Sequence, residues 1–472
     1  MGYASSRRKG TPLPALLAAL ALPVVLSGCA TYSDSFSPVQ GDLASQKYDA
    51  ALKDIEKQSG SKTDRVLYLL NKGMVLRMKR DFVGSNQALE AAKTEMDRLF
   101  AASVSQNAMS FLVNDSTVSY GGEDYEQVLV HLYMALNYLE LGQKDDARVE
   151  AQQVDIKLRE IASKVFGNRY VKDAFTLYLT GMIYEDLGER SDAMISYRDA
   201  YTAYKKYQAS YGTPVPEELK HDLLRMAVQL GLNDEAAQYS KEFNIPLASA
   251  GGDPSRARDG ELVFIFNNGL APIKREKRVT TLAPPPSAFT GGGGTPPVYV
   301  TIALPYYESR PNNVASARIS ALAKQASTER AENIDAIARA SLESHMGAIT
   351  ARSIARAVVK AKIQESVDRA GQRNNNNNSG AGAALLGSIF VRVASVATER
   401  ADTRSWLTLP AEIQLARLHL PPGEYTIKVE LLDAGGQTVA TREYPGIVIT
   451  EGHMTYLTDQ WTPPVMRSTA RR

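Results

Sequence analysis

Apolar residues follow a helical period through the first half of the chain. From Tyr48 onward they recur at i, i+3, i+4 and i+7, and the first proline after this point is Pro214. This spacing is typical of amphipathic helices, each of which packs one face against its neighbours. We therefore expect a helical domain over residues 47–245, preceded by a tether at 29–46 and followed by a linker at 246–260.

Four segments within the helical half resemble one another; they begin at Leu67, Leu129, Phe175 and Asp222. In each segment, small residues stand where two paired helices would touch. They are Gly73, Ala135 and Gly181 in the first helices and Ser85, Ala147, Ala193 and Ala236 in the second helices. The pattern resembles tetratricopeptide repeats, which implies a stacked array of helix hairpins. The units are longer than the regular repeat of about 34 residues, so we expect elongated helices and an insert at about 100–124.

A set of apolar residues projects onto the face that is concave in arrays of this kind. The set is Leu67, Leu70, Met74, Leu132, Leu136, Leu139, Phe175, Tyr178 and Met182. Because an apolar face of this size is not stable against water, we interpret these residues as a partner-binding surface. The alternative within the chain is that Ala-rich helices between 316 and 397 cover the face. A different helix register, which would make the same residues ordinary core, also stays open.

The second half of the chain mixes strand and helix patterns. Residues 261–267 (ELVFIFN) and 298–304 (VYVTIAL) are rich in β-branched and aromatic residues and predict strands. Residues 316–369 are Ala-rich and predict helices that divide near Gly347. The apolar segment 381–397 is too short for a comfortable membrane span, so we expect a buried helix. A membrane-lying or oligomerising helix is the alternative.

Strand patterns return between about 410 and 460, with a turn at Gly435 and Gly436. Leu420-Pro421-Pro422-Gly423 before Tyr425 resembles the opening of small immunoglobulin-like β-sandwich modules. The expected fold class is therefore α+β. A tetratricopeptide-like helical array is followed, over 261–472, by a mixed α/β domain with Ala-rich helices and an immunoglobulin-like β-sandwich portion.

The amino terminus carries a targeting signal. Arg7, Arg8 and Lys9 precede an apolar stretch that ends in Leu26-Ser27-Gly28-Cys29, and Cys29 is the only cysteine. This ending resembles the lipobox of bacterial lipoproteins, which implies a signal peptide at residues 1–28 and acylation of Cys29, palmitate included. Ala30 follows the cysteine and, by the same resemblance, implies the outer membrane, with the protein on the periplasmic side. An ordinary signal peptide is the alternative.

Charge excludes one class of partner. Lys plus Arg is 54 and Asp plus Glu is 52, so the chain has no basic field for nucleic acid. The charges are unevenly distributed, with 25 basic and 32 acidic residues over 29–250 but 26 and 20 over 251–472. We therefore expect the two halves to attract each other.

Candidate chemistry is sparse. Five histidines lie far apart and one cysteine is present, so we expect no metal site and no cofactor. The densest polar cluster is Glu399, Arg400, Asp402, Arg404 and Trp406, which we interpret as a salt-bridge network rather than an acid–base pair. A basic run, Lys274, Arg275, Lys277 and Arg278, is expected in a solvated turn. We expect no catalytic residue and hence no enzyme.

Several long stretches resemble a family of bacterial outer-membrane lipoproteins of unassigned activity. They are 120–139, 261–276, 332–362 and 398–410, together with the lipobox at Cys29. The resemblance implies an envelope protein and adds no catalytic residue. Our hypothesis is a non-catalytic scaffold, lipid-anchored in the outer membrane, that binds an unidentified protein partner. The alternatives are an enzyme or enzyme activator acting on peptidoglycan or envelope polysaccharide, and a self-assembling, homo-oligomeric envelope component.

Overall fold

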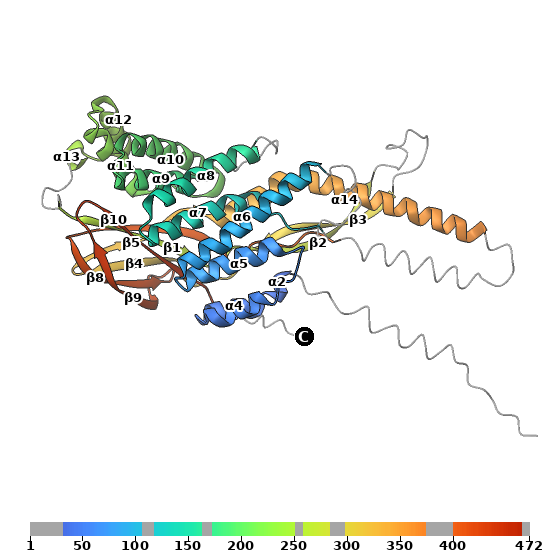
Figure 1. The fold of residues 1–472 in the computed structure, drawn as a ribbon. Helices are drawn as coiled ribbons and strands as arrows, with labels where there is room; N and C mark the ends of the chain where they lie inside the picture. The colour runs from blue at the N-terminus through green and yellow to red at the C-terminus, as the bar shows by residue number, and fades with distance from the viewer. Residues whose placement is uncertain are drawn as a thin grey trace, which may run out of the picture.

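The computed structural model combines helices in the first half with strands and one long helix in the second (Figure 1). It describes residues 32–105, 118–162, 172–250, 258–283, 298–373 and 400–464. Cys29, the Asn run at 374–378 and the apolar segment 381–397 lie outside these ranges, so the predictions for them stay untested. No helix within the described ranges is long and apolar enough to span a membrane.

The first half is an array of helix hairpins. Its main helices are α4 (Tyr48–Glu56), α5 (Arg65–Met78), α6 (Phe82–Ser105), α7 (Asp124–Glu140), α8 (Lys144–Ala162), α9 (Ala174–Asp186), α10 (Arg190–Tyr211), α11 (Glu217–Gln229) and α12 (Asn233–Phe243). The pairs α5–α6, α7–α8, α9–α10 and α11–α12 pack together, and each pair also contacts the next. Between 127 and 207 the described residues contain no strand. The repeat prediction is therefore confirmed by the helix contacts themselves.

Small residues stand where paired helices touch. A Cβ atom placed on Gly73 would lie 2.7 Å from the Leu89 side chain on the second helix of the same pair. A Cβ on Gly181 would lie 2.4 Å from the ring of Tyr197. Real Cβ atoms do not approach other heavy atoms this closely, so each glycine is needed for its helix pair to close.

The predicted tether is in large part folded. Two short helices, α2 (Tyr32–Ser35) and α3 (Ser37–Ala44), occupy most of 29–46. Phe36, Val39 and Leu43 are at most 2% exposed and belong to the core of the helical array. Their spacing places them on one helix face. Burial of these three side chains stabilises the folded segment, which a polar tether could not achieve.

The strands form two four-stranded sheets and a ribbon. They are β1 (Gly260–Asn268), β2 (Ile273–Ala283), β3 (Val298–Glu308), β4 (Ser316–Ala321), β5 (Lys324–Ser327), β6 (Glu329–Asn333), β7 (Glu412–Leu420), β8 (Gly423–Leu432), β9 (Thr438–Ile449) and β10 (Met454–Trp461). Sheet 1 has the order β10-β1-β7-β6, and sheet 2 has the order β5-β4-β8-β9. Strands β2 and β3 pair only with each other.

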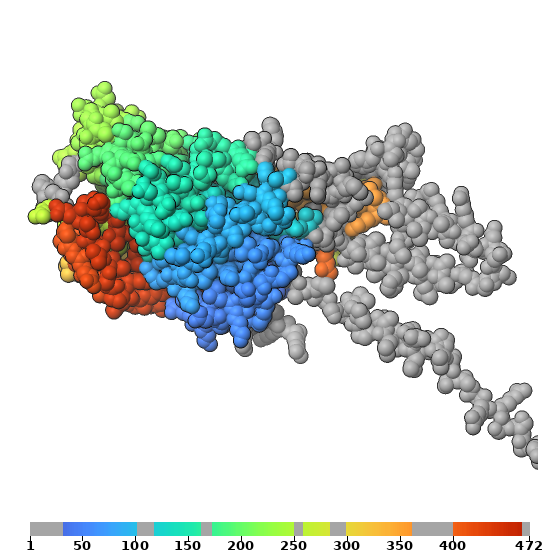
Figure 2. Space-filling model, in the orientation of Figure 1, coloured from blue at the N-terminus to red at the C-terminus, as the bar shows by residue number. Residues whose placement is uncertain are grey.

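Strand β1 separates two hydrophobic cores. Leu262, Phe264 and Phe266 point into the core between sheets 1 and 2, whereas Val263 and Ile265 belong to the core shared with the helical array. Alternate residues of a strand face opposite sides, so β1 is apolar on both faces because both are covered. Figure 2 shows the carboxyl-terminal strands, in red, lying directly against the blue and green helices.

The two sheets form a sandwich, but its topology does not confirm an immunoglobulin-like module. Strand β1 pairs in parallel with β10, and four of the eight sandwich strands come from residues 260–333 rather than from about 410–460. Immunoglobulin sheets are antiparallel and draw consecutive strands from one short module. The carboxyl-terminal strands instead complete sheets that the earlier strands begin.

Three further predictions for the second half are wrong. Residues 316–333 form strands β4 to β6 instead of helix, because Ala317, Ile319 and Ala321 pack into the sandwich core and Ala331 packs into the core of the helical array. The helix α14 (Ile334–Arg373) then runs without a break past Gly347. The basic run at 274–278 is part of strand β2, not a turn, and Lys274 is buried there. Strand β3 packs along α14, and Figure 1 shows the two extending together from the body.

Candidate functional site

The predicted partner-binding surface is closed in this structure. Its residues, Leu67, Leu70, Met74, Leu132, Leu136, Leu139, Phe175, Tyr178 and Met182, are all between 0% and 5% exposed. They share one core with Val263 and Ile265 of sheet 1 and with Ile334 and Ile337 of α14. The chain therefore covers its own array, as one alternative proposed. The cover is sheet 1 together with the start of α14, so an Ala-rich helix from 316–397 supplies only part of it.

A buried ion network joins the array to sheet 1. Arg417 of β7 forms short contacts with Asp222 of α11, and its Nε and Nη2 atoms donate to Glu261 of β1 at 2.5 and 2.6 Å. Its Nη1 also donates to the Tyr178 hydroxyl at 3.0 Å. Burial would raise the pKa of Asp222, but Arg417 and Arg225 outweigh it, and the pKa is lowered. The carboxylate is therefore ionised and fixes the sheet on the helices.

Glu126 links the start of α7 to the segment before β7. Its carboxylate accepts hydrogen bonds from the Tyr120 hydroxyl at 2.6 Å, the Trp406 backbone N–H at 2.7 Å and the Glu123 backbone N–H at 3.2 Å. Burial raises its pKa to about 7, with Glu123 adding to the rise. The carboxylate is enclosed by these donors and lines none of the cavities described below, so its role is structural.

The polar cluster around 402–406 is a structural network, as predicted. Arg404 lies 2.7 Å from Asp402 and 3.2 Å from Asp64 of the helical half. Its guanidinium also stacks 5.2 Å from the Tyr120 ring centre. Trp406 is 1% exposed and packs edge-on against Tyr133 at 6.0 Å. Glu399 lies outside the described residues.

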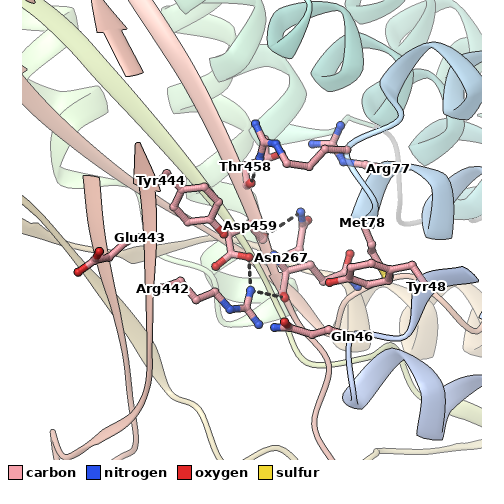
Figure 3. Close-up of a pocket in the computed structure, with 12 residues that line it drawn as sticks. Gln46, Tyr48, Arg77, Met78, Asn267, Arg442, Glu443, Tyr444, Thr458 and Asp459 are labelled. Carbon is pink, nitrogen blue, oxygen red and sulfur yellow. Dashed lines mark hydrogen bonds and ion pairs between the residues drawn. The ribbon is translucent and has the colours of Figure 1, made fainter. Parts of the chain in front are cut away.

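One cavity, of about 230 Å³, lies where both sheets meet the helical array (Figure 3). We call it the Arg77 cavity. Its lining is Gln46, Tyr48, Arg77, Met78, Arg80, Asn267, Arg442, Glu443, Tyr444, Thr458, Asp459 and Gln460. These residues come from the helical half, from β1 and β10 of sheet 1 and from β9 of sheet 2, so only the assembled fold creates the cavity.

Two arginines of the Arg77 cavity are paired with carboxylates, and the third is not. Arg80 lies 2.9 Å from Glu140, and Arg442 forms a short ion pair with Asp459. Arg77 donates through Nη1 to the side-chain oxygen of Asn137, while its buried Nη2 has no hydrogen-bond partner. Burial lowers the pKa of Arg77 to about 10. Arg77 therefore still carries its charge at neutral pH.

A second cavity, of about 410 Å³, lies between the 118–124 loop, the β2–β3 ribbon, α14 and residues 401–404. Its charged groups are in large part paired. Lys274 contacts Glu123, and His345 Nε2 lies 2.8 Å from Asp124 Oδ2. The hydrogen bond to Asp124 raises the pKa of His345 despite partial burial. This pairing ties α14 to the start of α7.

Sequence reasoning missed the buried charges that matter most here. Arg77 lies three residues after Met74, on the same helix face as the apolar set, and Glu126 lies among the buried residues of α7. A charged residue at a position that the helical period assigns to the core was a usable signal. Asp459 and Arg442 gave no such signal, because their burial depends on sheet packing.

Among the described residues, no three His, Cys, Asp or Glu side chains are grouped as a metal site would require. No family model matches the chain, and no curated protein sequence matches it.

Several solved structures share a weak likeness with part of the chain. MamA is 15% identical, over 44% of this chain and 92% of its own, with a TM-score of 0.27. The Rap conjugation gene regulator of plasmid pLS20, solved with the Phr* peptide, is 13% identical over 45% and 54%, with a TM-score of 0.28. Aspartyl phosphate phosphatase F from Bacillus subtilis is 14% identical over 47% and 52%, with a TM-score of 0.31. These are tetratricopeptide-like repeat proteins. TM-scores this low do not establish a common fold, so the repeat assignment rests on the helix contacts of this chain.

Proposed function

We propose that this protein is a non-catalytic scaffold of the bacterial envelope, anchored in the outer membrane through lipid on Cys29 and facing the periplasm. The observation that carries the scaffold role is the exposure of apolar side chains on the second helices of successive pairs, two of which line one groove. Val83 of α6, Val149 and Ile156 of α8 and Ile195 of α10 are each at least 50% exposed. Single exposed apolar residues are common, but Val149 and Ile156 line the same groove, and apolar side chains grouped in this way mark a protein interaction site.

Charge and shape indicate the kind of partner. Val149 and Ile156 line a groove of about 490 Å³ between α6 and α8, whose rim includes Asp97 and Glu160. The chain over 29–250 carries 25 basic and 32 acidic residues. Inside the groove Lys157 pairs with Asp97 and Glu160, and Lys93 pairs with Glu150. The groove itself therefore favours a partner segment with apolar side chains, and the acidic balance of 29–250 favours basic residues around that segment.

The scaffold role is tested at the groove. Ile156→Glu should abolish co-purification of the partner after crosslinking of intact envelopes, because it places a charge in an apolar contact. Val448→Glu is the matched control, since Val448 is 57% exposed on β9. Both variants should keep the melting temperature of the parent. Equal recovery of the same partner with both variants would contradict the proposal.

The anchor is tested separately. Helix α2 begins at Tyr32, so a lipid on Cys29 would hold the folded body close to the membrane surface. Cys29→Ser should abolish palmitate labelling and leave the unprocessed precursor. A variant that still labels and still fractionates with the outer membrane would show that the lipobox interpretation is wrong.

A further inference from the structure

The Arg77 cavity contains a buried hydrogen-bond donor with no acceptor. Arg77 is 4% exposed, and its Nη2 atom finds no hydrogen-bond partner among the residues that the structure describes. A buried donor left unsatisfied costs about 1–3 kcal/mol, and more when it is charged. Such groups in folded proteins are satisfied by an ordered water or by a ligand.

The charges of the cavity favour a ligand with one negative charge. Arg80 is compensated by Glu140, and Arg442 is compensated by Asp459. Glu443 points away from the other side chains (Figure 3). Glu140 and the rings of Phe82 and Tyr133 lie near Arg77, but among the described residues no carboxylate forms an ion pair with it, so Arg77 is the arginine of this cavity whose charge a ligand would match. A carboxylate matches one charge, whereas a phosphate monoester carries about −1.5 to −2 at neutral pH and would bring more.

The walls favour an acid with an apolar body. Tyr48 and Tyr444 lie on opposite sides of the Arg442–Asp459 pair, and Met78 adds an apolar side chain (Figure 3). The Oδ2 atom of Asp459 is also buried and makes no hydrogen bond of normal geometry among the described residues, although the Tyr444 hydroxyl lies close to this carboxylate. It offers an acceptor for an N–H group on the same ligand. An acylated amino acid carries a carboxylate, an amide N–H and an apolar side chain together.

We propose that the Arg77 cavity binds the carboxylate of a small N-acylated amino acid or of a peptide carboxyl terminus. Arg77 Nη2 donates to the carboxylate, and charge-assisted hydrogen bonds of this kind are about twice as strong as neutral ones. Asp459 accepts from the ligand's amide N–H. This inference does not rest on the proposed scaffold role or on the lipid anchor, since neither surface contributes to the cavity.

The test compares an acid with its neutral counterpart. N-acetyl-leucine and N-acetyl-leucinamide are titrated into the purified protein by calorimetry at pH 7 in chloride-free buffer. The acid should bind at least tenfold more tightly than the amide. Equal affinities for the acid and the amide, or no heat of binding from the acid at tens of millimolar, would overturn the proposal. The cavity would then be occupied by water.

Variants locate the binding. Arg77→Gln should reduce the affinity for the acid to that for the amide. Lys79→Gln is the matched control, because Lys79 is an exposed cation close in sequence whose Nζ pairs with Asp49 outside the cavity. It should change the affinity less than twofold. If Arg77→Gln does not fold, Tyr48→Ala replaces it and should weaken binding at least threefold, while no effect would place the site elsewhere and refute the assignment.

Two further titrations identify the source of the carboxylate. A tetrapeptide ending in leucine with a free carboxyl terminus is compared with its carboxamide. A preference for the free acid equal to that of N-acetyl-leucine supports a chain end, and a preference confined to N-acetyl-leucine supports a small metabolite. Inorganic phosphate that binds more tightly than N-acetyl-leucine would overturn the single-charge interpretation.

Discussion

At the scale of single residues, buried ionisable side chains join the two halves of the chain. Arg417 of β7 reaches Asp222 of α11, and Glu126 of α7 accepts from the backbone of Trp406. A buried charge is costly unless its partner is in place, so these pairs hold only when the sheets sit correctly on the helices. Arg310 is satisfied in the same way by neutral partners, since its guanidinium donates to the carbonyl oxygens of Ala271 and Leu407.

The raised pKa of Glu126 predicts a pH-dependent stability. Its pKa is about 7 in the fold, because of burial and then the nearby Glu123, against an ordinary value of 4.5. Between about pH 4.5 and 7 the unfolded chain has lost this proton while the folded chain retains it, so stability falls as pH rises. Each pKa unit of difference corresponds to about 1.4 kcal/mol.

Urea unfolding at pH 5 and pH 7.5 measures this effect. In Glu126→Gln, which cannot titrate, the fall in unfolding free energy between the two pH values should be smaller by about 2 kcal/mol. Glu424→Gln, at an exposed position on β8, should keep the parent's pH dependence. The same fall in Glu126→Gln as in the parent would contradict the assignment of a raised pKa to Glu126.

At the scale of elements, helix pairs and the sandwich follow different rules. The hairpins close through glycine at points of contact, as at Gly181 against Tyr197. The sandwich is packed by strands whose successive side chains face opposite sides, as along β1, where Phe264 faces one core and Ile265 faces the other. Helix α14 connects the array to the β2–β3 ribbon, because its start packs in the array core and Val358 packs on the ribbon.

Two glycine substitutions should shift stability in opposite directions. Gly181→Ala places a Cβ 2.4 Å from the Tyr197 ring and should lower the unfolding free energy by about 1–3 kcal/mol. Gly347→Ala meets no atom within 4 Å in the middle of α14 and should raise it by about 0.5–1 kcal/mol through helix propensity. Denaturant unfolding gives both values. A neutral or stabilising Gly181→Ala would show that this helix contact is not tight.

At the scale of the whole molecule, the helical array and sheet 1 share one core. Inner residues such as Leu136 and Phe175 belong to the same cluster as Val263, Ile265 and Leu415. Neither half can bury these residues without the other. The two halves should therefore unfold together, in a single transition.

Leu136→Glu tests this shared core. Leu136 is 0% exposed, so an unpaired charge there should destabilise the protein by a few kcal/mol, roughly 3–5. Ile195→Glu is the control, because Ile195 is 56% exposed on α10. Thermal melts followed by circular dichroism in helix and strand bands should shift together for Leu136→Glu. Helix and strand signals that melt separately would contradict a common core.

The sequence by itself determined the features that depend on local periodicity. The helical period from Tyr48 to Phe243, the small residues Gly73 and Gly181 and the strand at 261–267 are all found where they were predicted. A helix or strand pattern repeats within a few residues, so it can be recognised without knowledge of the fold. The burial of Arg77 could have been predicted for the same reason, because the helical period assigns its position to the core.

Only the tertiary structure decided what covers the helical array and where the Arg77 cavity lies. Residues 316–333 have an Ala-rich composition that favours helix, yet pairing of β4 with β8 and of β6 with β7 makes them strands. Strand partners far apart in sequence leave no local signature, and long-range burial outweighs the small differences in intrinsic propensity. For the same reason Asp459 and Arg442, which meet Arg77 only across this packing, could not be assigned to one site from the sequence.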